Sequence, residues 1–389
     1  MATVVNISRN GKDVEGIKSL PGLTAPLLRL NGLAPYYTMF PLSFPFKALS
    51  KAITGDWVLD PFCGRGTTVL AARLRGLPSV GIDSNPVAGA IASAKLASVK
   101  PFEIIALARE TLDDRRPGPV SDTPRGEFWD LCYTSETLRD ICRIRNRLLE
   151  SCSTRVEVAL RGLMLGILHG PLMKTRPTYL SNQMPRTYST KPDPAVRYWR
   201  KRDLLPPAVD VLAAIGRRAR FSFQEVPPAT SGKVVIGDSR QFDYECLGTS
   251  FSWVITSPPY YGMRTYFPDH WLRNWFVGGP ADVDYRADDQ LSHHGEAKFV
   301  EDLSSVWRRV AGVCHPEARL VCRFGALPSC ERDPRDLIRR SLADADCGWR
   351  ITTIRDAGSS HLGRRQCDQF GGGKNDPLDE IDVYASLEK

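Results

Sequence analysis

The run from Val58 to Thr68, Val-Leu-Asp-Pro-Phe-Cys-Gly-Arg-Gly-Thr-Thr, constrains the fold of this chain more than any other feature. Its apolar start suits a short buried strand, and its two glycines suit a tight turn that opens a helix. A second strand, Ser79 to Asp83, and a helix from about Pro86 to Ala97 follow directly. This β-α-β-α order predicts a parallel, doubly wound α/β sheet.

A segment with helical periodicity then interrupts the alternation. After an exposed linker at 111–126, we expect helices at 136–150, 156–172 and 204–219, with a Pro-, Tyr- and Arg-rich loop at 174–202. The pattern divides the chain into three parts: an N-terminal half of the core at 1–112, a helical and basic insertion at 127–222, and a C-terminal half of the core at 226–389.

Strand-like runs resume after the insertion. They lie at 233–236, 252–256, 318–324, 349–355 and 381–387, with helices expected between them. The last two runs suit an antiparallel hairpin. The predicted architecture is therefore one mostly parallel sheet with an antiparallel C-terminal hairpin and a helical insertion.

Length and charge narrow the class of partner. A chain of 389 residues is long enough for a complete α/β core and an additional module. The net charge of +8 is concentrated in residues 136–202, which carry 14 Lys and Arg against five Asp and Glu. A basic segment in an otherwise nearly neutral chain is typical of proteins that bind a phosphate backbone. A solvated helical face would give the same charge count.

Cysteine spacing and hydropathy argue against two classes of protein, those with a cysteine metal site and those that span a membrane. The ten cysteines include no C-x-x-C pair, so we expect reduced, mostly buried thiols and no metal site. The most apolar stretch, 158–173, is interrupted by Arg161 and His169, and the N-terminus lacks the apolar core of a secretory signal. We expect no membrane span and a cytoplasmic location.

The glycine turn suits a nucleoside-containing ligand. Gly64 permits the tight turn and Gly66 permits a close approach of the backbone to a ligand. Val69 stands where dinucleotide-binding turns have a third glycine, which disfavours NAD. Asp60, directly before the turn, suits a positively charged amino group better than a pyrophosphate. Asp83, at the end of the next strand, stands where an acidic residue binds ribose hydroxyls.

A second motif, Ser257-Pro258-Pro259-Tyr260, follows the apolar strand expected at 252–256. Consecutive prolines donate no backbone hydrogen bonds and keep the residues before them extended, so nearby carbonyls become fixed acceptors. If the Ser257 hydroxyl and the Pro258 carbonyl accept the two hydrogens of an exocyclic amine, its nitrogen lone pair is directed at an electrophile. The Tyr260 ring offers a face on which a base can stack.

Together the two motifs resemble those of the S-adenosylmethionine-dependent DNA amino-methyltransferases, which methylate N4 of cytosine or N6 of adenine. The resemblance implies a Rossmann-like class I methyltransferase sheet, S-adenosylmethionine as cofactor, and base flipping of the target. It implies that Asp60 and the turn hold the methionine end, Asp83 the ribose, and Asp238 the adenine amino group. The cofactor contacts that it implies are Asp60, Phe62, Cys63, Gly64, Gly66, Thr67, Thr68, Asp83, Asp238, Phe40 and Pro41. The family commonly has serine where this chain has Arg65.

The first residue of the Ser-Pro-Pro-Tyr motif bears on the target base. Within the resembled family, serine at this position goes most often with N4-cytosine and aspartate with N6-adenine. Ser257 therefore predicts cytosine N4, with adenine N6 as the alternative.

The insertion is the predicted reader of DNA. Its central loop combines basic side chains with Tyr179, Tyr188, Tyr198 and Trp199, which can wedge or stack, and with the amides of Asn182 and Gln183. The residues expected to contact DNA are Arg176, Arg186, Lys191, Arg197, Arg200, Lys201 and Arg202. The alternative is a helical scaffold that only braces the sheet.

These features predict a sequence-specific methyltransferase that acts on double-stranded DNA. The resemblance places it in a restriction-modification or other defence setting, with a cognate restriction endonuclease or other defence proteins as partners. Two other classes stay open: a methyltransferase for RNA or for a protein amide, and a catalytically silent DNA-binding protein that keeps the fold.

Overall fold

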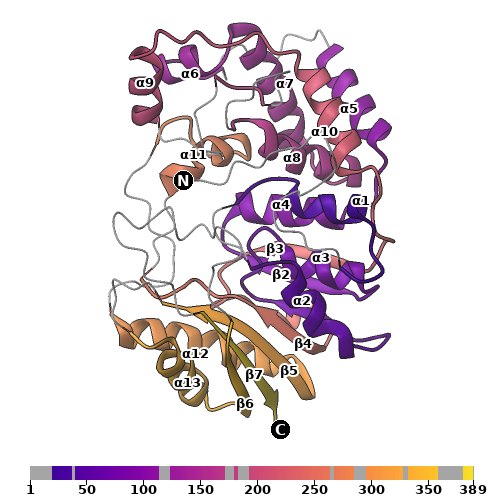
Figure 1. The fold of residues 1–389 in the computed structure, drawn as a ribbon, viewed down its shortest axis with the longest axis vertical. Coiled ribbons are helices and arrows are strands. Elements are labelled where there is room, and N and C mark those ends of the chain that lie inside the picture. Colours follow the sequence, from indigo (N-terminus) through magenta and orange to yellow (C-terminus); the bar gives the residue numbers. More distant parts are fainter. Residues whose placement is uncertain are drawn as a thin grey trace.

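The computed structural model describes residues 20–36, 40–113, 123–170, 179–182, 192–262, 267–283, 295–326, 332–357 and 380–388. Figure 1 shows two layers stacked along the long axis, an α/β sheet region below and a helical region above it. No helix within these described ranges is both long and apolar enough to cross a bilayer.

Seven strands form a single sheet in the order β3-β2-β1-β4-β5-β7-β6. Neighbouring strands run parallel except β7, which is antiparallel to both β5 and β6. This arrangement confirms the predicted Rossmann-like sheet with its antiparallel C-terminal pair. The strands are β1 (Val58–Asp60), β2 (Ser79–Asp83), β3 (Gly232–Ile236), β4 (Phe251–Thr256), β5 (Cys314–Gly325), β6 (Trp349–Asp356) and β7 (Glu380–Leu387).

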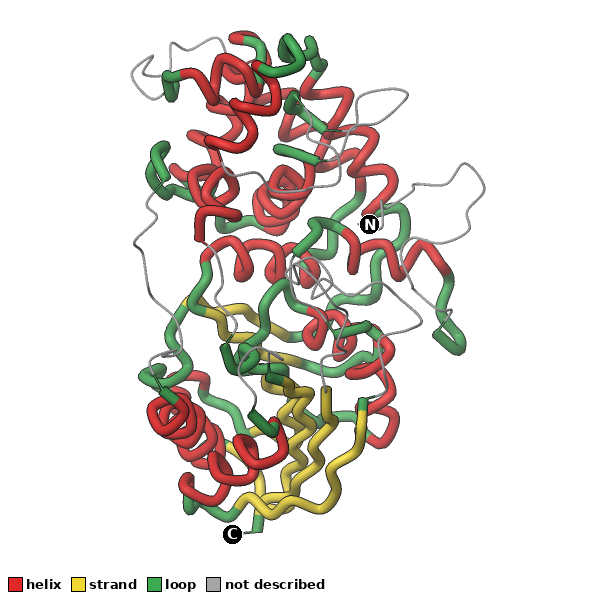
Figure 2. The backbone as a smooth tube through the Cα atoms, turned by 60° about the vertical axis from the view of Figure 1, so that its left-hand side comes forward, coloured by secondary structure: helices red, strands yellow, loops and turns green. Residues whose placement is uncertain are grey.

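Helices cover both faces of the sheet, so the central strands are apolar on both sides. Val58 packs into the core beneath α3 and α4, whereas the next residue, Leu59, packs into the core beneath α12 and α13. Figure 2 shows these helices flanking the strands. The helices of this region are α1 (Ala25–Leu28), α2 (Ser43–Ala48), α3 (Thr67–Leu74), α4 (Pro86–Leu96), α12 (Glu296–Gly312) and α13 (Pro334–Ala345), with 3-10 turns η1 (Arg29–Gly32), η2 (Leu49–Lys51) and η4 (Tyr244–Leu247).

The helical region is larger than the insertion predicted from periodicity. It contains α5 (Pro101–Asp113), α6 (Glu127–Cys132), α7 (Ser135–Glu150), α8 (Arg155–Ile167), α9 (Pro192–Arg200), α10 (Val211–Ser222) and α11 (Phe267–Phe276). Helix α5 precedes the insertion in sequence but packs on α10, α8 and α7. Helix α11, which follows the insertion by many residues, joins the same region through aromatic contacts with α6.

The predicted helices differ from the observed ones for local reasons. Helix α10 begins at Val211 rather than near 204, because two prolines precede it and the Asp210 side chain caps it by accepting from the Ala213 N–H. The expected loop at 174–202 is wrong for residues 192–200, which form α9. Proline at its first position is compatible with a helix start.

Helices α4 and α8 join the two regions through glycines. A Cβ at Gly162 would lie 2.3 Å from the Ala94 Cβ, and one at Gly166 would lie 2.2 Å from the Leu33 carbonyl oxygen. The helical region is therefore seated directly on the helix that follows β2, because glycine lets the two backbones approach closely.

This close packing predicts opposite effects for two glycine-to-alanine changes. Gly166→Ala should lower the free energy of unfolding by more than about 2 kcal/mol, because the neighbouring backbone cannot yield. Gly216→Ala is the control. Its added Cβ would meet the flexible end of Arg220 at 3.2 Å and Ile105 at an ordinary contact distance of 3.8 Å, so helix propensity should raise stability by up to about 1 kcal/mol. Denaturant unfolding measures both, and equal effects would contradict the proposed packing role.

Candidate functional site

The two sequence motifs meet at one edge of the sheet. Strands β1 and β4 are parallel neighbours, with Val58 opposite Trp253 and Leu59 opposite Val254. Both strands therefore end at the same edge, and the Thr256 hydroxyl donates a 2.6 Å hydrogen bond to Oδ1 of Asp60. Both side chains are fully buried. The residue before Ser257 is thus bonded to the residue that opens the glycine turn.

Asp60 has one satisfied and one unsatisfied carboxylate oxygen. Oδ1 also accepts from the Phe62 N–H at 3.1 Å, whereas Oδ2 is buried and accepts no hydrogen bond from the described residues. Burial raises the pKa of Asp60 to about 6, although the hydrogen bond from Thr256 acts in the opposite direction. An ammonium group beside Oδ2 would satisfy this oxygen and favour the ionised acid. Asp60 therefore fits the amino end of a methionine moiety.

The two glycines of the turn, Gly64 and Gly66, lie in different surroundings. Gly64 has φ +48°, and a Cβ there would meet nothing within 4 Å. Gly66 has φ +79°, and its Cβ would lie 2.7 Å from the Ala92 Cβ of α4. Gly66 therefore lets α4 pack closely against the turn. Its expected approach to a ligand stays a prediction. The open side of the turn is at Gly64.

Asp83 is held at the end of β2 by two backbone donors. The Gly64 N–H donates to its Oδ2 at 2.8 Å, and the Asn85 N–H donates to its Oδ1 at 2.9 Å. Burial nevertheless raises the pKa of Asp83 above its ordinary value, with the two hydrogen bonds opposing the shift. The carboxylate therefore lies against the open side of the turn, where ribose hydroxyls are expected.

Asp238 lies at the end of β3 and is already paired. Arg240 donates to it from its backbone N–H, from Nε at 3.0 Å and from Nη2 at 2.6 Å. The same guanidinium reaches Asp302 of α12 at 3.0 Å. Burial would raise the pKa of Asp238, but the hydrogen bonds from Arg240 prevail and lower it, so the acid stays ionised. Because Nε is shared between Oδ1 and Oδ2, each oxygen accepts two contacts from Arg240. The Asp238 side chain stays 34% exposed, which leaves it within reach of a ligand.

The side chains of several residues that were predicted to contact the cofactor pack within the protein. The Thr68 hydroxyl donates to the Ile255 carbonyl at 3.2 Å, which joins α3 to β4. Thr67 is buried as well. The Cys63 thiol lies against Gly81, where a Cβ would come within 2.9 Å of it, and burial raises its pKa. The half-buried Phe62 ring meets Trp307 edge-on at 6.5 Å.

The Phe-Pro segment before the first strand packs beside the turn. The Phe40 ring contacts Phe44 edge-on at 5.4 Å, and Phe44 lies under the Arg323 guanidinium at 4.2 Å. Arg323 is itself held by a bidentate ion pair with Asp382. Pro41 is exposed. Because α2 also packs on α3, this segment lies against the helix that starts at the turn.

The Ser-Pro-Pro-Tyr corner leaves β4 and turns toward β5. Ser257 and Pro259 are half-buried and Pro258 is buried. The Tyr260 ring meets Phe324 edge-on at 6.2 Å, and the Tyr261 N–H donates to the Gly325 carbonyl at 3.2 Å. The corner is therefore braced by the end of β5 while its first residue stays accessible.

The structure separates the predicted DNA contacts. Arg176, Arg186 and Lys191 lie outside the described residues. The other four cluster at the end of α9, are all exposed, and are Arg197, Arg200, Lys201 and Arg202. Arg200 pairs with Glu127, and the Arg202 guanidinium lies 4.0 Å above the Tyr198 ring.

Three side chains of the same segment are not available to a base. Trp199 is fully buried and Tyr179 is nearly so. Asn182 is buried and donates to the carbonyls of Leu131 and Leu204. Their expected role in stacking or base reading is therefore wrong, and they build the helical region instead.

Some contacts of this site escaped the sequence analysis. Thr256 precedes the Ser-Pro-Pro-Tyr motif directly, and only the strand pairing reveals its bond to Asp60. Asn85 accepts from the Val87 N–H and so caps α4, a role that its place before Pro86 signals. Among the described residues, no group of three His, Cys, Asp or Glu side chains is arranged to hold a metal ion.

Comparisons with known proteins bear on the cofactor half. Residues 29–93 match a family model described as DNA methylase, N6_N4_Mtase. The type II methyltransferase M.MthZI of Methanothermobacter thermautotrophicus is 39% identical over 64 residues, which are 16% of this chain and 18% of that protein. These matches confirm the predicted resemblance over this segment, and with it S-adenosylmethionine as the cofactor.

Solved structures of lower identity also superpose on the chain. TrmN from Thermus thermophilus is 11% identical with a TM-score of 0.35, covering 93% of this chain and 53% of that one. The rRNA methyltransferase aviRa from Streptomyces viridochromogenes is 13% identical with a TM-score of 0.35, covering 91% and 87%. The fold assignment rests on the strand order of the sheet itself.

The raised pKa of Asp60 predicts a pH dependence of stability. Because the folded protein holds this proton more tightly than the unfolded chain, stability from Asp60 is lost as the pH rises from about 4 to about 6. Relative to Asp60→Asn, the wild-type free energy of unfolding should fall by up to about 3 kcal/mol across this interval. Denaturant titrations at several pH values measure the difference.

Asp56→Asn is the control, because the pKa of Asp56 is lowered: hydrogen bonds from Ile53 and Trp253 outweigh its burial. Its stabilising contribution is lost as the pH falls, so its pH dependence should have the opposite sign. A flat difference between wild type and Asp60→Asn would contradict the burial of an ionisable Asp60.

Proposed function

We propose that this chain, whose residues 29–93 match the DNA methylase family, transfers a methyl group from S-adenosylmethionine to the exocyclic amino group of a base in double-stranded DNA. The observation that carries the proposal is the hydrogen bond from Thr256 to Asp60. It places the corner that would hold an amine beside the turn that would hold the methyl donor. Neither motif alone would require that proximity.

Three carboxylates would hold the cofactor. Asp60 would pair its free Oδ2 with the methionine ammonium, and Asp83 would accept from the ribose hydroxyls. Asp238, oriented and kept ionised by Arg240, would accept from the adenine amino group. When bound, S-adenosylmethionine supplies an electrophilic methyl group. All three acids lie at the ends of the neighbouring strands β1, β2 and β3, so they define one edge of the sheet.

The corner would prepare the amine. The Ser257 hydroxyl and the Pro258 carbonyl would accept its two hydrogens, which draws the nitrogen toward tetrahedral geometry and directs its lone pair outward. The half-buried Tyr260 would stack on a base that has left the duplex, which offsets part of the few kcal/mol that unstacking costs. No covalent bond between the enzyme and the base is needed.

The target base that we propose is cytosine, methylated at N4 and in a defined sequence context. The serine at position 257 supports cytosine through the family tendency, and adenine N6 is the alternative outcome of the same chemistry. A restriction-modification or defence setting, with an endonuclease or other defence proteins as partners, belongs to the same proposal.

The corner predicts a specific loss on substitution. Ser257→Ala should lower the methylation rate by about 10²-fold with unchanged affinity for the cofactor product S-adenosylhomocysteine, because only an acceptor for the amine is removed. Ser50→Ala, an exposed serine on η2, is the matched control and should retain wild-type activity. Nucleoside mass spectrometry of methylated DNA measures rate and product together.

N4-methylcytosine that depends on Ser257 would support the full proposal, and N6-methyladenine would change the base only. Methylation of RNA but not of DNA would overturn the DNA assignment. Unchanged activity of Ser257→Ala would overturn the role of the corner.

The exposed end of α9 is the proposed DNA surface among the described residues. Arg197, Arg200 and Arg202 replaced together by glutamine should weaken binding and reduce the slope of log K against log salt by about 0.9 for each phosphate that the protein no longer neutralises. Arg339, Arg350 and Arg355, which are exposed on α13 and β6, replaced in the same way make an equal charge change elsewhere. The two sets lie at opposite ends of the molecule in Figure 1. Equal salt slopes for both triple variants would contradict a DNA surface at α9.

A further inference from the structure

Tyr36 is a buried tyrosine beside the predicted ribose acid, and no motif accounts for it. Its hydroxyl accepts a 3.0 Å hydrogen bond from Nδ2 of Asn85. Its ring stacks on His270 with centroids 4.8 Å apart and an interplanar angle of 24°. The residue therefore lies between the start of α4 and helix α11, two elements far apart in sequence.

Asn85 holds the Tyr36 hydroxyl in a defined orientation. Its backbone N–H donates to Oδ1 of Asp83, and its side-chain Oδ1 accepts from the Val87 N–H at 2.9 Å. Because the amide oxygen caps the helix, the amide nitrogen must face Tyr36. Asp would cap the helix equally well but has no donor, and Ser has no amide nitrogen beside its capping oxygen. The chain thus fixes the phenol oxygen as an acceptor.

The phenol proton then has a restricted set of partners. Burial and the nearby Asp83 carboxylate raise the pKa of Tyr36, so the hydroxyl keeps its proton. Its bond with Asn85 uses the oxygen as acceptor, and no hydrogen bond donated by this hydroxyl is found within the described ranges. A buried donor without an acceptor costs about 1–3 kcal/mol. An oxygen of a bound ligand next to Asp83 would remove that cost.

We propose that Tyr36 is a further cofactor-binding residue whose hydroxyl donates to a ribose oxygen of the nucleoside that Asp83 holds. Asp83 accepts the ribose hydroxyl protons and Tyr36 supplies the complementary donor, so the pair matches a ribose hydroxyl as donor and acceptor at once. This inference rests on the proposed function, since that function supplies the nucleoside.

The stack with His270 keeps the Tyr36 ring in place. His270 is buried on α11, and Arg273 of the same helix donates to the Pro35 carbonyl at 2.6 Å. Burial lowers the pKa of His270 to about 3, so the ring that stacks on Tyr36 is neutral at physiological pH. Two adjacent residues of the N-terminal segment are thus held by the helix that follows the Ser-Pro-Pro-Tyr corner in sequence. Figure 1 shows α11 above and to the left of α4, and the two helices are in contact.

The test is the affinity of the purified full chain for S-adenosylhomocysteine, measured by isothermal titration calorimetry. Tyr36→Phe keeps the ring and its stack but removes the hydroxyl, and should weaken binding about tenfold. Tyr133→Phe is the matched control, because it removes a fully buried hydroxyl that donates to the Leu168 carbonyl within the helical region. It should lower thermal stability and leave the affinity unchanged.

Analogues of the ligand separate a ribose contact from a general packing effect. With S-adenosylhomocysteine that lacks the 2′-hydroxyl or the 3′-hydroxyl, the tenfold difference between wild type and Tyr36→Phe should vanish for one of the two. A difference that persists with both analogues would overturn the ribose contact and leave a packing role for Tyr36.

The outcomes also separate this inference from the proposed function. If wild type binds S-adenosylhomocysteine and Tyr36→Phe binds it equally well, the Tyr36 contact is wrong and the proposed function stands. If folded wild type does not bind S-adenosylhomocysteine at all, the proposed function fails, and the Tyr36 inference fails with it. Circular dichroism and thermal unfolding of each variant establish that it is folded.

Discussion

The hydrogen bond between Thr256 and Asp60 is the contact on which the arrangement of the site depends. Two parallel neighbours, β1 and β4, bring residues nearly two hundred positions apart to the same edge of the sheet. Ligands of open α/β sheets bind at such carboxyl edges, where loops diverge. The bond links the end of β1, where the glycine turn begins, to the end of β4, where the Ser-Pro-Pro-Tyr corner begins. The positions of the turn and the corner are therefore fixed relative to each other. The reaction that we propose needs this proximity more than it needs any single reactive side chain.

A buried acid at this position has a cost that a ligand would remove. Asp60 keeps one oxygen without a donor among the described residues, and burial raises its pKa to about 6. The isolated protein therefore carries part of the energetic disadvantage of a desolvated carboxylate. An ammonium beside Oδ2 would reverse it. The same logic applies to Tyr36, whose buried hydroxyl lies near Asp83 and has no acceptor within the described ranges. Both groups suit a ligand that is charged at one end and hydroxylated in the middle.

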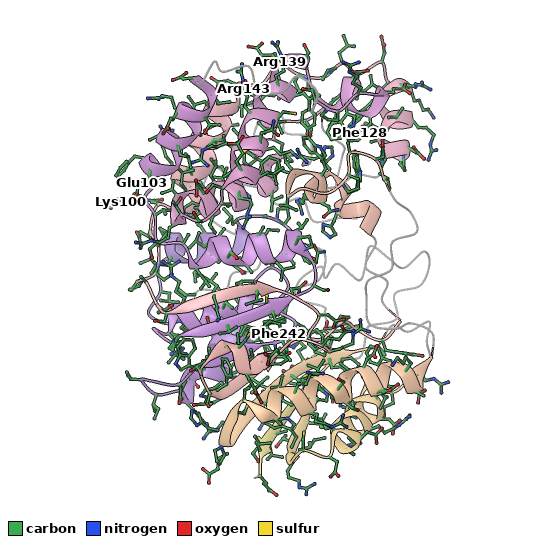
Figure 3. The ribbon with its side chains drawn as sticks, turned by 180° about the vertical axis from the view of Figure 1, so that it is seen from behind. Lys100, Glu103, Phe128, Arg139, Arg143 and Phe242 are labelled. Carbon is green, nitrogen blue, oxygen red and sulfur yellow. The ribbon has the colours of Figure 1, made fainter. Side chains whose placement is uncertain are left out.

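Packing contacts, and not only the connecting chain, hold the helical region against this edge of the sheet. Gly162 on α8 seats it on α4, whose N-terminus carries Asn85. On the other side, Trp271 and Trp275 of α11 pack against Phe128 and Trp129 of α6. Figure 3 shows Phe128 inside the helical region, with Arg139 and Arg143 of α7 at the end far from the sheet. A DNA-binding surface on α9 would therefore be held at a fixed position relative to the Ser-Pro-Pro-Tyr corner.

The sequence by itself determined the chemistry of the motifs and the type of sheet. Strand-turn-helix periodicity around Asp60 and the apolar run before Ser257 are local properties, so the parallel sheet and its antiparallel C-terminal pair could be predicted from them. Asp60 and Asp83 were identifiable because each is the last residue of a strand, whereas Asp238, two residues beyond β3, was identified through the family resemblance. A family match over residues 29–93 agrees with that prediction.

Only the tertiary structure decided which partner each of these groups meets. Gly66 lies against Ala92, Trp199 and Asn182 are buried, and α5 joins the helical region, because burial depends on contacts between distant segments. The same holds for Thr256 and Tyr36, whose partners are set by strand order and by the docking of α11. Local propensity specifies which element forms, whereas the packing of elements specifies what each side chain touches.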